Sequence, residues 1–102
     1  MNPVLHIKVL AGNKANLTDR AVAVDIKRMH IIPIVNAPNA TVLLNFDGID
    51  TMGADFANAL FIDLRHFYNG KVKMLNMGVM VKKAIADAIR TADALALAGV
   101  DA

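Results

Sequence analysis

Several residue types that carry common protein chemistry are missing from this chain. Its 102 residues include no cysteine, serine, glutamate, glutamine or tryptophan. The missing cysteine excludes disulfides, thiolate catalysis and zinc–thiolate sites, and the missing serine excludes a serine nucleophile and a phosphoserine. All nine acidic residues are aspartates. Aspartate is therefore the only carboxylate side chain available for acid–base chemistry.

Long apolar runs and clustered charge are also missing. No run reaches the roughly 18 residues that a membrane span requires, and the first residues lack the basic start and apolar block of a signal peptide. We therefore expect a cytoplasmic protein without membrane contact. The formal net charge is only +2, and Lys27-Arg28 and Lys82-Lys83 are the only adjacent basic pairs. Because phosphate affinity comes from clustered charge, we expect no nucleic-acid partner.

The residues that are present predict one domain over residues 1–102, since 56% of the chain is hydrophobic and can form a core. Strand patterns alternate with helix patterns, which predicts an α/β fold with right-handed crossovers. Strands are expected at residues 4–10, 41–46 and 71–77, with a short extended piece near Leu17. Helices are expected from Thr18 to about residue 31, from residue 50 or 51 to about 68, and from 79 to 99.

The first helix has several specific features. Thr18 is the expected N-cap, with Asp19 just inside the first turn. Val22, Ile26 and Met29 form the apolar stripe expected to face the core. Because Pro33 disfavours helical geometry at the residue before it, we expect the helix to end at about residue 30 or 31.

Polar residues gather where two predicted strands end. The carboxyl ends of neighbouring strands are where α/β proteins bind ligands and partners, beside the amide groups of helix N-termini. We expect Asp47, Asp50, Thr51 and Asn76 to meet at this edge. Asp47 and Asp50 are interpreted as turn former and helix cap. An acid–base or divalent-ion role for the pair is the alternative.

The second predicted helix is apolar around more than one face. It is interpreted either as a helix buried between the sheet and a neighbouring helix, or as a docking patch that includes Phe61 and Ile62. Elsewhere, the isolated glycines form no phosphate-binding loop. His6, His30 and His66 fall on separate predicted elements without metal-ligand spacing. We therefore expect no cofactor and no metal site.

Two long segments read VLLNFDGIDTMGADFANALF and KVKMLNMGVMVKKAIADAI. Together they resemble the STAS domain of sulfate transporters and anti-sigma-factor antagonists. The matching parts are an apolar strand, the turn Asp50-Thr51-Met52-Gly53, an amphipathic helix, a strand ending in Asn76, and a helix with the pair Lys82-Lys83. The chain is more similar still to the STAS-like family of unknown function, through Phe46-Asp47-Gly48, Asp55-Phe56-Ala57 and Leu17-Thr18-Asp19-Arg20.

The resemblance implies a mixed sheet of about four strands with three main helices packed mostly on one side. It also implies a non-enzymatic module that binds another protein, often a histidine-kinase-like ATPase that can act as a serine kinase. Met52 occupies the position of the family's phosphorylated serine, and Thr51 that of the serine before it. Either the phosphorylation site has moved to Thr51, or the protein binds without a phospho-switch. We favour binding without a switch.

The leading hypothesis is a regulatory or adaptor domain that binds a protein partner through the turn 47–53 and the helix after it. The expected contact residues are Asp47, Asp50, Thr51, Met52, Phe61, Ile62 and Asn76. One alternative is a small enzyme or ligand-binding domain that uses Asp47 and Asp50. Another is a structural subunit that forms a homodimer or larger homo-oligomer through its apolar second helix.

Overall fold

The computed structural model describes residues 3–67 and 70–97, with side chains placed outside 62–67, 92–93 and 95–97. Three strands form its main sheet: β1 (Val4–His6), β3 (Val42–Asn45) and β5 (Val72–Leu75). They are all parallel, in the order β1-β3-β5. A second parallel pair joins β2 (Asn16–Leu17) to β4 (Thr51–Met52). The α/β class is therefore confirmed, while the described strands form two parallel sheets where one mixed sheet was predicted.

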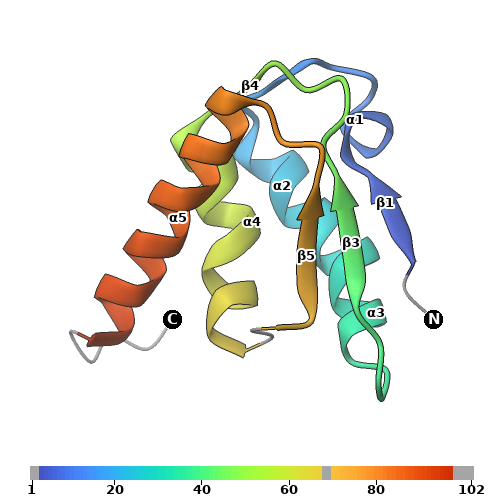
Figure 1. Ribbon diagram of the computed structural model, residues 1–102, viewed down its shortest axis with the longest axis vertical. Coiled ribbons are helices and arrows are strands. Elements are labelled where there is room, and N and C mark those ends of the chain that lie inside the picture. Colours follow the sequence, from blue (N-terminus) through green and yellow to red (C-terminus); the bar gives the residue numbers. More distant parts are fainter. Residues whose placement is uncertain (1–2, 68–69, 98–102) are drawn as a thin grey trace.

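Helical segments connect the strands and follow the last one. They are α1 (Ile7–Leu10), α2 (Arg20–Ile26), the π-helix η1 (Lys27–Ile31), α3 (Ile32–Val35), α4 (Ala54–Phe67) and α5 (Val79–Leu97). In Figure 1, α2 and α3 lie behind β3 and β5, and α4 lies beside α5. Among the described residues, no helix is long and apolar enough to cross a membrane.

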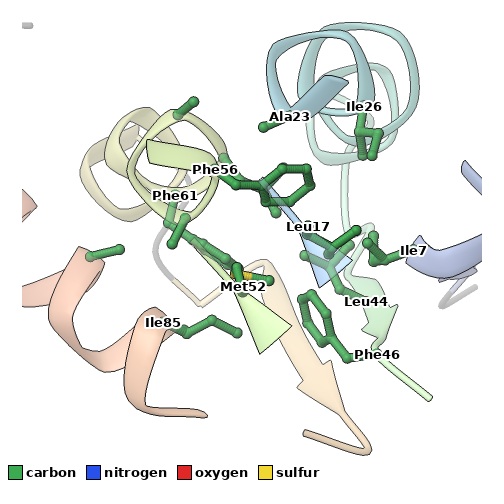
Figure 2. Close-up of a cluster of buried hydrophobic side chains, with 14 of the residues drawn as sticks. Ile7, Leu17, Ala23, Ile26, Leu44, Phe46, Met52, Phe56, Phe61 and Ile85 are labelled. Atoms are coloured by element: carbon green, nitrogen blue, oxygen red, sulfur yellow. The ribbon is translucent and has the colours of Figure 1, made fainter. Parts of the chain in front are cut away.

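The core lies between the main sheet and the helices. Along β3, Val42 and Leu44 are fully buried, whereas Leu43 and Asn45 on the opposite face are half-buried. This alternation places one face of the sheet against the helices. Figure 2 shows side chains from both sheets, α2, α4 and α5 in one cluster. The labelled residues are Ile7, Leu17, Ala23, Ile26, Leu44, Phe46, Met52, Phe56, Phe61 and Ile85.

The first strand is shorter than predicted. β1 ends at His6, which is opposite Asn45, the last residue of β3. The chain then forms α1 and closes it with Gly12 and Asn13, which both adopt left-handed backbone conformations. The amide of Asn13 donates to the carbonyl of Lys8 at 2.8 Å. The strand prediction for residues 7–10 was wrong, since β3 offers no backbone partner beyond Asn45.

The first long helix differs from its prediction at both ends. Its N-cap is Asp19, whose Oδ1 accepts from the amide of Ala21 at 2.9 Å, so the Thr18 cap was wrong. The helical path also continues beyond residue 31 through η1 into α3. Pro33 lies in the first turn of α3, where its missing N–H costs little. Residues 36–40 form the loop that was predicted to include residues 31–35 as well.

The π-helix changes which side chains of this segment face the core. Ile26 is buried as predicted, but Met29 is 68% exposed and Val22 is only half-buried. Lys27 and Ile31 are buried, whereas Met29 is not. A π-helical turn contains more residues than an α-helical turn, so it rotates side chains within and after it, including Met29 and Ile31, away from the predicted 3.6-residue stripe. Val22 precedes the π-helix, so its partial exposure does not follow from this turn.

Candidate functional site

The carboxyl ends of β3 and β5 are joined by the side chain of Asn45. Its Oδ1 accepts from the backbone amide of Asp47 at 2.9 Å and from Nδ2 of Asn76 at 3.1 Å. Asn76 has a positive φ of 57°, a conformation that asparagine tolerates better than most residues. The prediction that the strand ending at Phe46 and the strand ending near Asn76 are neighbours is confirmed. Asn45 itself was missed, although an asparagine ends β3 and another directly follows β5.

The loop after β3 places two carboxylates in solvent. Asp47 and Asp50 are both exposed. Neither carboxylate has a hydrogen bond or ion pair with any residue for which the structure gives a side chain. Gly48 has a positive φ of 82°, and a Cβ there would lie 2.9 Å from Cδ of Lys8. The lysine stem thus packs over the turn and holds the loop against α1.

Thr51 contacts a different part of the chain. It lies in β4, where its Oγ1 donates to Oδ1 of Asn16 at 2.6 Å, and the amide of Asp50 donates to the carbonyl of Ala15 at 2.7 Å. The helix begins only at Ala54, so neither Asp50 nor Thr51 is its N-cap. The predicted start of this helix at residue 50 or 51 was wrong, because these residues pair with β2. The backbone amide of Asp47 and the side chain of Asn76 are therefore linked through Asn45, while Asp50 and Thr51 lie against the β2 segment.

Two of the predicted contact residues belong to the core. Phe61 is 3% exposed and Met52 is 8% exposed, and Figure 2 shows both within the buried cluster. Phe56, Ala57 and Leu60 are buried as well, because α4 packs between α2 and α5. The interpretation of a buried second helix holds for these residues. Of the two residues in the predicted docking patch, Phe61 is not exposed. The side chain of Ile62 lies outside the described residues.

A groove between α4 and α5 was not anticipated from the sequence. It has a volume of about 260 Å³, and its lining includes Met52, which directly follows Thr51. Its other lining residues are Ala54, Asn58, Met80, Lys83, Ala84, Asp87, Ala88 and Thr91. The α5 residues recur at helical spacing beside the buried stripe of Val81, Ile85 and Ala88. The spacing of the α5 residues could have been recognised in the sequence. The α4 side of the groove could not, because it depends on how the two helices pack.

The groove is lined by apolar and polar side chains, and we call the exposed Met80 its entrance. Met80 is 57% exposed and Val79 is 84% exposed, at the first turn of α5. Asp87 forms an exposed ion pair with Arg90, and its carbonyl accepts from Oγ1 of Thr91 at 3.0 Å. The groove therefore combines methionine and alanine surfaces with lysine, aspartate and asparagine around them.

Histidine and carboxylate side chains do not gather into a metal site in the part of the chain that the structure describes. His6 is exposed on β1 and His30 is half-buried in η1. The side chain of His66 lies outside the described residues. The groove between α4 and α5 and a small hollow beside β2 are lined by neither Asp47 nor Asp50.

Comparison with known proteins gives no relative on which to base a function. No protein-family model, no curated protein and no solved structure matches the chain.

Proposed function

We propose that this chain is a non-enzymatic, STAS-like regulatory or adaptor module that binds a protein partner at the carboxyl ends of its strands. The observation that carries the proposal is the continuity between an exposed polar edge and a partly apolar groove. Asp50 and Thr51 are exposed, and the next residue, Met52, lines the groove. On the other side, exposed Asn76 precedes the exposed Met80 by four residues.

The properties of the groove support a protein partner over a small organic ligand. Its volume of about 260 Å³ is below the roughly 300–1,000 Å³ that pockets for drug-sized ligands occupy. It suits one or two side chains of a docking protein. Methionine side chains adapt to irregular partner surfaces, and exposed apolar residues with a polar rim are typical of interfaces. Met80 is the side chain best placed to contact a partner.

Several observations favour binding over acid–base catalysis. Asp47 and Asp50 are exposed to solvent, outside the groove and the hollow beside β2. A general acid or base needs a bound substrate within hydrogen-bond reach, and usually an environment that tunes its pKa. The sequence also lacks the serine, cysteine and glutamate residues that most often pair with histidine in nucleophilic catalysis.

The STAS-like identity belongs to this proposal. Helices behind the main sheet and an asparagine at the end of β5 support it, whereas the all-parallel main sheet departs from the expected mixed sheet of four strands. A histidine-kinase-like ATPase is the partner class that the resemblance implies. Binding is proposed to need no phosphate: the Thr51 hydroxyl already donates to Asn16, and a phosphate there would remove this donor.

Affinity purification from the native host tests the proposal with a matched pair of substitutions. Met80→Asp places a charge at the groove entrance. Met29→Asp makes the same change at another exposed methionine, 68% exposed on η1. We expect the tagged wild type and Met29→Asp to retain the same partner, and Met80→Asp to lose at least about 90% of it, roughly the effect of 1.4 kcal/mol. Equal retention by both variants would contradict the proposal.

A further inference from the structure

The face of the main sheet that points away from the helices carries two rows of side chains. In the first row Val4, Leu43 and Lys73 lie side by side on β1, β3 and β5. In the second row the register brings together His6, Asn45 and Leu75. Val4 is 42% exposed and Leu75 is 37% exposed, and Lys73 and His6 are also exposed. We call these six residues the open face.

An uncovered face is unusual for a parallel sheet. Parallel sheets occur almost only with both faces covered, because their crossover helices pack against them. In Figure 1 the strands are viewed with α2 and α3 behind them, and no described element passes in front of β3 or β5. The residues of β3 that alternate with Leu43 and Asn45, namely Val42 and Leu44, are fully buried against the helices. Only one face of this sheet is therefore covered by the chain's own described residues.

The composition of the open face indicates what could cover it. Three of its side chains are apolar: Val4, Leu43 and Leu75. Lys73 carries a positive charge, while His6 and Asn45 are polar, and none of the six is a carboxylate. Covering the face would bring an apolar strip and a lysine out of water together. A lysine buried without a negative partner costs free energy, so a covering surface that supplies a carboxylate near Lys73 avoids that cost.

We propose that an acidic amphipathic helix of a partner protein binds the open face. The outer strands of a three-stranded sheet lie about 10 Å apart, close to the diameter of one helix with its side chains. Apolar residues at helical spacing would contact Val4, Leu43 and Leu75, and carboxylates beside them would pair with Lys73. No open-face residue lines the groove between α4 and α5, although Asn45 also belongs to the polar edge of the proposed site.

The charge on the open face argues against the other occupants. A second copy that used the same face would bring a second Lys73, and none of the six residues that it presents is a carboxylate. Nucleic acid would find one lysine and no aromatic side chain on which a base could stack. An acidic helix is the occupant that satisfies both the apolar strip and the lysine.

A designed peptide pair tests the proposal on the intact protein. The probe is a helical peptide of about 15 residues with a leucine stripe flanked by glutamates, and its control carries lysine at each glutamate position. Backbone amide shifts are followed by NMR during titration. We expect the acidic peptide to shift the amides of residues 4–6, 42–45 and 72–75, and the basic peptide to bind at least about tenfold more weakly.

Charge reversal at two exposed lysines gives the matched protein control. Lys73→Glu should weaken the acidic peptide at least about tenfold and Lys73→Gln should weaken it less, whereas Lys82→Glu on α5 should leave binding unchanged. The proposal is overturned if both peptides bind equally, if Lys82→Glu has the same effect, or if no binding occurs up to about 1 mM. Self-association detected by sedimentation, with amide shifts in residues 4–6 and 72–75 that depend on protein concentration, would also overturn the proposal. Loss of partner binding by Met80→Asp tests the proposed function at the groove and does not test the open face.

Discussion

At the residue scale, Asn45 connects the two loops that form the candidate site. Its Oδ1 accepts one backbone amide and one side-chain amide, from the loops after β3 and β5. The strand and the Asp47-Gly48 turn were predicted because both are encoded locally, by an apolar run followed by a turn pair. The bond to Asn76 was not, since it depends on the register of two strands that are far apart in sequence.

Removing the Asn45 acceptor should loosen both loops. We expect Asn45→Ala to lower the free energy of unfolding by about 1 kcal/mol, since hydrogen bonds near solvent lie at the low end of the usual range. Asn45→Asp keeps an acceptor oxygen and should lose less than half of that. Urea denaturation of both variants checks the expectation. Equal losses in the two variants would mean that the acceptor oxygen at residue 45 does not account for the lost stability.

Gly48 and Gly53 make a second test at this scale. Gly48 has a positive φ, whereas Gly53 does not, and a Cβ at Gly53 would meet the Leu17 carbonyl oxygen at an ordinary 3.5 Å. Gly48→Ala should therefore destabilise the protein by about 1 kcal/mol, and Gly53→Ala should change the stability by less than about 0.5 kcal/mol. Thermal melts compare them directly. A larger loss for Gly53→Ala than for Gly48→Ala would contradict the expectation that the positive φ at Gly48 makes a side chain costly there.

At the scale of elements, local patterns predicted the long strands and helices better than the short ones. β3 lies in a nearly continuous apolar run, β5 is rich in apolar residues and α5 has an apolar stripe at helical spacing, so their existence followed from the sequence. β4 contains only Thr51 and Met52, and it is a strand because Asn16 and Leu17 lie beside it. The π-helix was also missed, since Pro33 favours a helix end and its position in the first turn of α3 depends on the preceding backbone.

Phe61 decides whether α4 is a core helix or a docking helix. Because the side chain is 3% exposed, Phe61→Ala should cost about 3 kcal/mol or more, as for other buried phenylalanines. Phe61→Leu keeps most of the apolar volume and should cost less than half as much. Chemical denaturation measures both. Wild-type stability in Phe61→Ala would instead place the ring on the surface, as an exposed patch requires.

At the scale of the whole molecule, the chain folds into one α/β layer arrangement with a radius of gyration of 12.8 Å. This matches the roughly 13 Å of a compact chain of about 100 residues. Alternating strand and helix patterns predict such layering, because each element must bury an apolar face. The groove between α4 and α5 could not be predicted in the same way. It depends on how two helices pack, and the small residues Ala54, Ala84 and Ala88 acquire their role only there.

The footprint of the retained partner tests the central claim most directly. Hydrogen–deuterium exchange of the purified complex, compared with the free protein, reports which backbone segments the partner covers. The account predicts slower exchange in residues 47–54 and 76–80, at the polar edge and the groove entrance. Slower exchange confined to other segments, with residues 47–54 and 76–80 unchanged, would contradict it.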